Sequence, residues 1–150
     1  MYLKRLSWNS FGNLTIDLAE KVRSEFKVNV VVGVGKSGAI PAVIIAKRLR
    51  VEEFYLVTVK LYDEGKPPKR LVEKPEVAYH NFGDLRGKRV LVVDDFARTG
   101  STLKSVLSIL REKGADEVRV AVIALREDAK MKPDYYAMKF KGCVIFPWDI

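Results

Sequence analysis

The sequence contains few of the residues that build disulfide frameworks, imidazole sites or membrane spans. Cys143 is the one cysteine among 150 residues, so no disulfide can form within the chain, and we expect it to be a small apolar residue rather than a nucleophile. His80 is the one histidine and has no acid or cysteine at catalytic spacing, which favours a surface or structural role. No apolar run approaches about 20 residues, so neither a membrane span nor a signal peptide is expected. We therefore expect a cytoplasmic protein without a membrane partner.

The sequence also lacks a concentrated basic segment. Its 27 lysines and arginines outnumber 19 acidic residues, giving a formal net charge of +8, but they are scattered along the chain. Nucleic acid is therefore not expected as a partner, whereas a small phosphorylated substrate is compatible with the charge. With 48% hydrophobic residues, the chain is long enough for one domain, residues 1–150, with its own core.

Apolar periodicity predicts strands that alternate with helices. The first helix has an apolar face of Phe11, Leu14, Leu18 and Val22 and a cap at Ser7 or Ser10. The next expected elements are a strand at 28–32, a helix at 39–49, strands at 54–60 and 90–93, a helix at 103–113 and a strand at 118–125. Residues 61–89 are rich in glycine and proline and predict a mobile lid with at most a short edge strand near Val77. This order predicts an α/β fold with a mainly parallel twisted sheet flanked by helices, and ligands at the carboxyl ends of its strands.

The segment 90–103, VLVVDDFARTGSTL, combines a buried strand, a polar turn and the start of a helix. Its apolar run predicts that the strand ends at Asp94 and Asp95. The turn then offers a cation, hydroxyl groups and a flexible backbone, from Arg98, Thr99, Gly100, Ser101 and Thr102. Because unpaired N–H groups and the helix dipole point into such a turn, it predicts an anion site beside two carboxylates.

A second glycine-rich loop, Gly33 to Gly38, satisfies two phosphate-site patterns only in part. It fits the dinucleotide-binding pattern G-x-G-x-x-G, and Glu53 lies 20 positions after Gly33. However, a ribose-binding acid should lie at the C-terminal end of the second strand, whereas Glu53 comes before that strand. The loop also ends like a P-loop, but residue 30 is valine where the opening glycine belongs. Both patterns leave a flexible loop that carries the cation Lys36 at a strand end and can approach a phosphate closely.

The segment 90–103 resembles the phosphoribosyl-diphosphate signature of the type I phosphoribosyltransferases. That signature has a strand, the pair Asp94-Asp95, two variable residues, Arg98, the run Thr99-Gly100-Ser101-Thr102, and a helix. The resemblance extends over nearly the whole chain and is strongest to the short xanthine-guanine and related 6-oxopurine members. Those share a Ser-Trp near the start, here Ser7-Trp8, and a closing Pro-Trp-Asp, here Pro147-Trp148-Asp149.

The resemblance implies a type I phosphoribosyltransferase fold with a mobile hood. It also implies Mg²⁺-dependent transfer of the 5-phosphoribosyl group from 5-phosphoribosyl 1-diphosphate (PRPP) to a 6-oxopurine base. Guanine, xanthine and hypoxanthine are the expected bases, and the products would be diphosphate and a nucleoside monophosphate for purine salvage. Since relatives are usually homodimers or homotetramers, a homo-oligomer is expected.

The same resemblance implies roles for residues at the carboxyl ends of the predicted strands. Asp94 and Asp95 would contact the ribose hydroxyls, directly or through Mg²⁺, because carboxylates offer the acceptor oxygens that both require. Together with Arg98 they form the expected catalytic group. The 5-phosphate would be held by Ala97, Arg98, Thr99, Gly100, Ser101 and Thr102, and the diphosphate by Gly35, Lys36, Ser37 and Gly38.

For the base, Arg126 falls where the 6-oxopurine enzymes carry a lysine that donates to the exocyclic oxygen. Cys143, next to Val144, takes the place of an aromatic residue on the purine face. Phe96 or Trp148 would then supply the apolar face instead. Asp149 completes the expected base-binding residues.

Arg98 is the main departure from the family pattern. Most 6-oxopurine enzymes have an aspartate there, thought to handle the N7 proton, and an arginine stays protonated and cannot be that base. Either the base arrives as its anion, or the chain acts on something else. Two alternatives therefore stay open: a regulator that binds PRPP or a nucleotide without turnover, and a phosphoribosyltransferase for another nucleobase.

Overall fold

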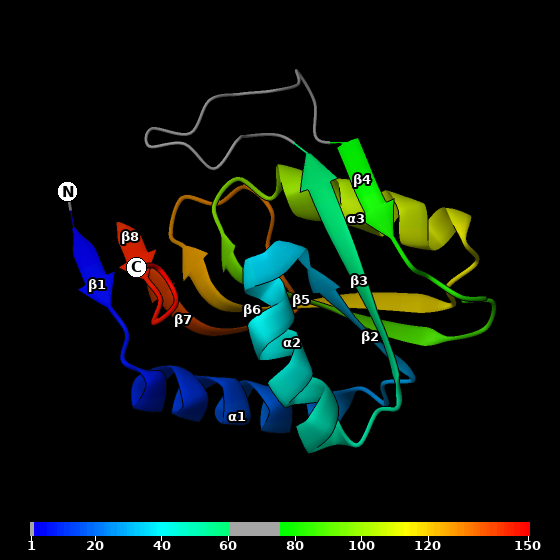
Figure 1. Cartoon of the computed structure of the whole chain (residues 1–150), viewed down its shortest axis with the longest axis horizontal. Coiled ribbons are helices and arrows are strands. Elements are labelled where there is room, and N and C mark those ends of the chain that lie inside the picture. Colours follow the sequence, from blue (N-terminus) through cyan, green and yellow to red (C-terminus); the bar gives the residue numbers. More distant parts are fainter. Residues whose placement is uncertain (1, 61–75) are drawn as a thin grey trace.

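The computed structural model describes residues 2–60 and 76–150, which form an α/β fold (Figure 1). The elements follow in the order β1 (Leu3–Arg5), α1 (Trp8–Glu25), β2 (Val30–Val34), α2 (Gly35–Leu49), β3 (Glu53–Lys60), β4 (Glu76–His80), β5 (Arg89–Ala97), α3 (Ser101–Glu112), β6 (Glu117–Arg126), β7 (Tyr135–Phe140) and β8 (Cys143–Ile145). Within these two ranges, no helix is both long enough and apolar enough to cross a membrane.

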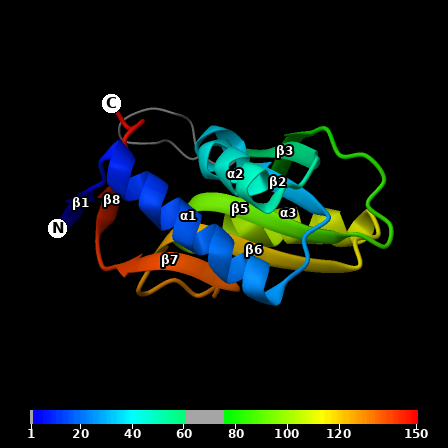
Figure 2. The same ribbon diagram turned by 90° about the horizontal axis from the view of Figure 1, so that it is seen from below.

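Six strands form one twisted sheet in the order β4-β3-β2-β5-β6-β7. Neighbouring strands pair in parallel except at one edge, where β4 runs antiparallel to β3. Helices α1 and α2 cover one face of the sheet and α3 covers the other (Figures 1 and 2). A mainly parallel sheet flanked by helices is the fold class that the sequence predicted.

The central strands divide the core between these two faces. On β5, Leu91 and Val93 pack with α1 and α2, whereas Val90 and Val92 pack with α3, and all four side chains are fully buried. A strand covered on both faces reads as a continuous apolar run rather than an alternating one. This is why the strand at residues 90–93 is recognisable in the sequence.

The predicted start of α2 is wrong by four residues. The helix begins at Gly35 rather than at residue 39, so Gly35, Lys36, Ser37 and Gly38 form its first turn and not a loop before it. Val34 precedes the helix and supplies no side-chain hydrogen bond to cap it. Because the usual serine, threonine, aspartate or asparagine cap is absent, the sequence gives no signal for this start.

The predicted end of β5 is also wrong, because the strand continues past the two carboxylates to Ala97. In the parallel ladder, Asp94 pairs with Val122, Phe96 with Ala124 and Ala97 with Leu125 of β6. Aspartate is disfavoured inside strands, so an apolar pattern stops too early at this position. The acid pair is therefore part of a strand that pairs with β6, rather than placed in a turn.

A two-stranded sheet that the sequence did not indicate joins the two ends of the described chain. β1 pairs in parallel with β8, with Leu3 opposite Cys143 and Arg5 opposite Ile145. Three-residue strands are too short to show an alternating pattern. The pairing places the C-terminal segment beside the start of α1 (Figure 1).

The rest of the chain supports the other sequence predictions. Ser7 caps α1 by accepting a hydrogen bond from the Ser10 N–H at 3.1 Å, and β4 is the predicted edge strand near Val77. Glu53 pairs with Val30 at the amino end of β3, at the edge opposite the phosphate loops, so the argument against a dinucleotide site is confirmed. Of the predicted lid, residues 61–75 lie outside the described part of the chain.

Candidate functional site

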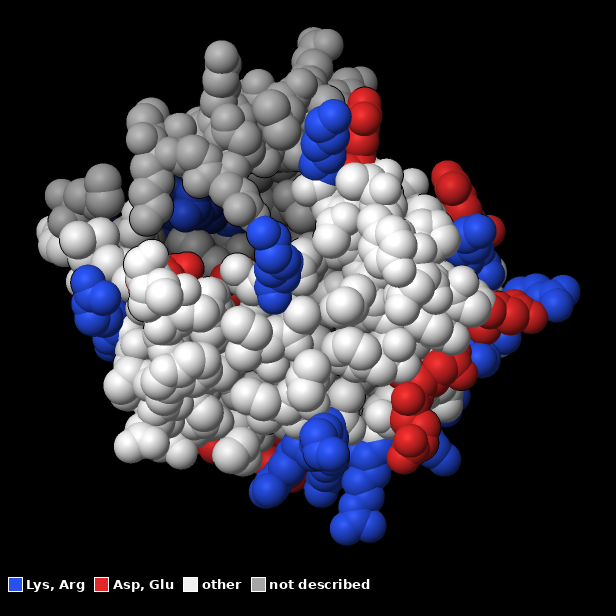
Figure 3. Space-filling model, viewed as in Figure 1, with Lys and Arg blue, Asp and Glu red and all other residues white. Residues whose placement is uncertain are grey.

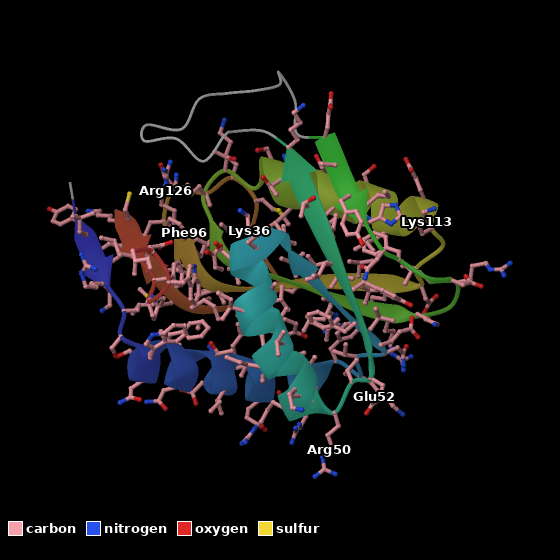
Figure 4. All side chains as sticks on the ribbon, in the orientation of Figure 1. Lys36, Arg50, Glu52, Phe96, Lys113 and Arg126 are labelled. Atoms are coloured by element: carbon pink, nitrogen blue, oxygen red, sulfur yellow. The ribbon has the colours of Figure 1, made fainter. Side chains whose placement is uncertain are left out.

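The candidate site lies where the carboxyl ends of β2, β5 and β6 meet at one edge of the sheet. β2 ends at Val34 and leads directly into α2, and β6 ends at Arg126. Figure 4 shows Lys36, Phe96 and Arg126 at this edge, whereas Arg50 and Glu52 lie at the far end of α2. Acidic and basic side chains are both visible at the same edge in Figure 3. The structure thus places the two predicted anion-binding segments together.

Asp94 and Asp95 form the centre of this edge. The Asp95 N–H donates to Asp94 Oδ1 at 2.8 Å, and the Phe96 N–H donates to Asp95 Oδ1 at 2.7 Å. Desolvation raises the pKa of Asp94 well above its ordinary value, and the neighbouring Asp95 charge raises it further. Desolvation also raises the pKa of Asp95, against the opposing effect of a hydrogen bond with Asp94. Two adjacent carboxylates withdrawn from water favour the binding of hydroxyl donors or a cation.

Gly38 brings the first turn of α2 against the acid pair. A Cβ placed on Gly38 would lie 3.0 Å from Asp94 Oδ1 and 3.0 Å from the Val93 carbonyl oxygen, closer than side-chain carbons normally approach oxygen. Glycine is therefore needed for the helix to start this close to β5. The first turn of α2 consequently lies against Asp94.

The α3 N-terminus follows the acid pair along the chain, after the end of β5 at Ala97. Gly100 precedes the helix with φ +87°, a left-handed conformation that favours glycine. The Ser101 N–H donates to Thr99 Oγ1 at 3.3 Å, and the hydroxyl groups of Thr99 and Ser101 lie 3.1 Å apart. A turn with exposed hydroxyls at a helix N-terminus is suited to binding a phosphate group.

Met131 is a neighbour of this turn that sequence reasoning missed. A Cβ on Gly100 would collide with the Met131 side chain, whose sulfur would lie 3.1 Å away. Met131 thus closes one side of the turn, from the segment between β6 and β7. No local sequence pattern links residues 100 and 131, so only the folded structure shows this contact.

Two arginines stand beside the acids at the ends of β5 and β6. The Arg98 guanidinium carbon lies 5.5 Å from the centre of the Phe96 ring, which is a cation–π contact. Arg126 forms a two-pronged ion pair with Asp128, in which Nη2 donates to Oδ2 at 2.9 Å. This hydrogen-bonded pair raises the pKa of the Arg126 guanidinium. Asp128 was not among the predicted site residues, although its position two residues after Arg126 made the pair possible.

The C-terminal segment is divided between the site and the core. Cys143 is half-buried and interacts electrostatically with Arg126, and the Asp149 charge contributes to the raised pKa of Asp95. These two residues therefore lie near the predicted base site. The Val144 side chain, by contrast, is 7% exposed within the core, so the structure does not bring it to the site.

Trp148 belongs to an aromatic cluster rather than to an open apolar face. Its ring stacks on Phe146 with centroids 4.8 Å apart and meets Phe11 edge-on at 4.9 Å. Its indole Nε1 is buried without a hydrogen-bond partner among the described residues. Phe96 and Trp148 are the two rings expected to cover the base, and Phe96 is the one with a cation, Arg98, next to it.

Comparisons with known proteins match this architecture. A family model for the phosphoribosyl transferase domain matches residues 6–150. The chain belongs to the phosphoribosyltransferase family. The crystal structure of a purine phosphoribosyltransferase from Pyrococcus horikoshii is 34% identical and superposes with a TM-score of 0.86, covering 99% of this chain and 94% of that one. The similarity to type I, 6-oxopurine phosphoribosyltransferases that the sequence indicated is thereby confirmed.

Curated relatives of this family member include both enzymes and regulators. The xanthine-guanine phosphoribosyltransferase of Idiomarina loihiensis is 28% identical over 146 residues, covering 97% of this chain and 86% of that protein. The transcriptional regulator GfcR of Methanococcoides burtonii is 28% identical over 138 residues, covering 84% of this chain and 65% of the regulator. The chain thus spans about two thirds of the length of that regulator.

The acid pair of this phosphoribosyltransferase domain has the chemistry to bind a divalent cation together with a ligand. Each carboxylate has one oxygen engaged by a backbone N–H, and both are held rigidly in the sheet. Within the part of the chain that the structure describes, no group of three or more histidine, cysteine, aspartate or glutamate residues could hold a metal. Mg²⁺ prefers oxygen ligands and commonly takes one or two carboxylates plus phosphate oxygens, so Asp94 and Asp95 fit that role.

Proposed function

We propose that this chain transfers the 5-phosphoribosyl group of PRPP to a 6-oxopurine base, releasing diphosphate and forming a nucleoside monophosphate. The observation that carries the proposal is that the first turn of α2 lies against Asp94, in the strand that leads through a short turn into α3. α2 reaches the pair through Gly38, and α3 begins six residues after Asp95. PRPP carries phosphate groups on both sides of a ribose, and this site offers anion-binding groups on both sides of two acceptors.

Each part of the site would then have one task. The first turn of α2, with Lys36, would bind the diphosphate, and the turn from Ala97 to Thr102 would bind the 5-phosphate. Asp94 and Asp95 would accept hydrogen bonds from the ribose hydroxyls. Bound Mg²⁺ would neutralise charge on the leaving diphosphate. Fixing both ends of PRPP holds the ribose C1 toward Phe96 and Arg126, where the base would lie.

Arg126 would donate to the exocyclic oxygen of the base. Its fixed ion pair with Asp128 holds the guanidinium in one orientation, which reduces the entropy lost when a base binds. Phe96 would cover one face of the purine. The chain's own residues would therefore bind, orient and stabilise charge, which are the main contributions to ribosyl transfer.

The test is a panel of reactions that contain the purified chain, PRPP, Mg²⁺ and one base at a time, followed by diphosphate release. Guanine, xanthine and hypoxanthine are compared with adenine, uracil and orotate. We expect turnover with at least one 6-oxopurine, and none when Asp94 and Asp95 are both changed to asparagine. Absence of turnover with every base, together with clear PRPP binding, would overturn the enzymatic proposal.

A regulator that binds PRPP or a nucleotide without turnover is the second candidate. Arg98 favours it, because a guanidinium cannot accept a proton from a base. The similarity to GfcR regulators supports it as well. The same panel separates the two functions, because a regulator would bind PRPP or a nucleotide and release no diphosphate.

A further inference from the structure

Arg98 directly follows the end of β5, and Arg126 is the last residue of the adjacent strand β6. The last pair of the parallel register between these strands is Ala97 with Leu125, so each arginine comes directly after one member of that pair. Their surroundings differ. Arg126 is paired with Asp128, whereas Arg98 is exposed, lies over the Phe96 ring and forms no ion pair with any residue in 2–60 or 76–150. Arg98 is therefore a positive charge at this edge that has no ion-pair partner among the described residues.

The other charged groups at this edge of the sheet show why Arg98 matters for the charge that a ligand meets there. Asp128 already offsets the charge of Arg126, and Asp149 and Asp95 add carboxylates that repel each other. Asp149 is also held in place, since its Oδ2 accepts a hydrogen bond from the Phe146 N–H at 2.9 Å. Arg98 is the cation that lies against the Phe96 ring. A planar ligand at Phe96 therefore meets a cation.

We propose that Arg98 makes the site selective for an oxopurine whose ring is negatively charged, a 2,6-dioxopurine anion, over neutral 6-oxopurines. The inference rests on the proposed function and names its substrate class. A 2,6-dioxopurine loses a ring proton near neutral pH, whereas a 6-oxopurine ring stays neutral there. A guanidinium stays protonated and donates hydrogen bonds, so it stabilises the anion and accepts no proton.

The transfer then balances without a protein base. The ring nitrogen of the anionic purine forms a bond to the ribose C1 while the bond from C1 to the diphosphate oxygen breaks. The electron pair of that bond leaves with the diphosphate, and the nitrogen supplies the pair for the new bond. The proton that a 2,6-dioxopurine loses near neutral pH comes from its pyrimidine ring, so the imidazole proton is still present when the bond to C1 forms and leaves to solvent afterwards. The negative pyrimidine ring offsets the positive charge that the imidazole ring carries until then, whereas a neutral base would carry that charge beside Arg98 without an offset.

The experiment compares the affinities of product nucleotides, which need no turnover. Xanthosine, guanosine and inosine 5′-monophosphates are titrated calorimetrically into the chain at mildly alkaline pH, where only the xanthine ring is largely ionised. We expect the unmodified chain to bind xanthosine monophosphate roughly tenfold more tightly than inosine monophosphate, as a charged hydrogen bond predicts. Arg98→Gln should reduce this preference to less than about threefold, whereas Arg98→Lys should keep most of it.

Arg50→Gln is the matched control, because Arg50 is also exposed but lies at the opposite end of α2 (Figure 4). It should leave the preference unchanged. Equal affinity for the nucleotides in the unmodified chain, or a preference that survives Arg98→Gln, would overturn the inference. If the chain turns over a 6-oxopurine but binds the nucleotides with equal affinity, the inference about Arg98 is overturned and the enzymatic proposal stands. A preference for xanthosine monophosphate without turnover of any base overturns the enzymatic proposal and supports the assignment of Arg98.

Discussion

Gly38 and Asp94 are in contact across the candidate site, although 56 positions separate them in the sequence. A side-chain carbon at Gly38 would lie 3.0 Å from Asp94 Oδ1. The missing side chain is therefore what allows a helix N-terminus to start against the half-buried Asp94 carboxylate. This close approach joins two segments that the sequence could only propose separately as anion sites.

Replacing Gly38 with alanine should weaken PRPP binding. The added methyl group meets Asp94 Oδ1 and the backbone of β5, neither of which can move freely, so α2 must shift outward. We expect a loss of about 1–3 kcal/mol in the free energy of unfolding, the usual cost of overpacking. Calorimetric titration with PRPP and Mg²⁺ should show an affinity lower by about tenfold or more.

Gly12→Ala is the matched control for this substitution. Gly12 is also a helical glycine, in α1, but no heavy atom lies within 4 Å of the position of its Cβ. Alanine there should stabilise the chain by roughly 0.5–1 kcal/mol and leave PRPP affinity unchanged. Equal effects of the two substitutions on PRPP binding would show that the contact with Asp94 has no bearing on the site.

Asp94→Asn should stabilise the protein while abolishing its function. Desolvation raises the pKa of Asp94 in the folded chain. The contribution of this carboxyl to the free energy of unfolding is therefore most favourable below the ordinary pKa of 3.8, and it is lost as pH rises through the raised value. Asparagine carries no charge and keeps the oxygen that accepts the Asp95 N–H. At pH 7 we expect a gain of roughly 1 kcal/mol, about 2–4 °C in Tm.

The pH dependence separates this electrostatic cause from a change in packing. The Tm difference between Asp94→Asn and the unmodified chain should shrink as pH falls from the raised pKa of Asp94 toward the ordinary value of 3.8, and should be smallest below that value, where the carboxyl is protonated in both the folded and the unfolded chain. A difference that stays constant between pH 3 and pH 7 would contradict the raised pKa. PRPP binding, measured on the same samples at pH 7, should be lost in the variant.

The sequence alone was sufficient to locate the carboxylates and the turn after them. A strand buried on both faces, followed by acids, hydroxyls and a glycine, is a local pattern, and local patterns are readable without tertiary contacts. The sequence misplaced the ends of these elements for a physical reason. Asp94 and Phe96 stay in β5 because β6 pairs with them, and Gly35 starts α2 without a side-chain cap.

Other parts of the site depend on contacts that no local pattern encodes. Met131 packs against Gly100, and the β1–β8 pairing brings Cys143 to the edge near Arg126. The cation–π contact of Arg98 with Phe96 shows why this substitution in the family pattern is compatible with the fold, since the ring supports the guanidinium. The sequence placed Arg98 among the site residues, and the structure adds its contact with the Phe96 ring.

Asp128→Asn should impair base binding without affecting PRPP binding. It weakens the ion pair that orients Arg126, so the guanidinium must be ordered when the base binds. We expect KM for the base to rise by about two- to tenfold with kcat nearly unchanged, as expected for a group acting through orientation. Glu117→Gln is the control, because Glu117 holds Arg119 in the same way, at 2.9 Å, at the other end of β6. A similar rise in KM for both variants would show that Asp128 has no specific role.

Removal of Mg²⁺ should abolish the stabilisation that PRPP confers. A ligand that binds only the folded state stabilises it by about 2.7 kcal/mol at a concentration 100 times its Kd. With Mg²⁺ and PRPP together, Tm should therefore rise by several degrees, and addition of EDTA should reverse the rise because the negative charges of the diphosphate and the two carboxylates would then not be neutralised. The variant with both aspartates changed to asparagine should show little response to Mg²⁺. If PRPP stabilises the unmodified chain equally with and without EDTA, the carboxylates act on the ribose hydroxyls alone and the metal assignment is wrong.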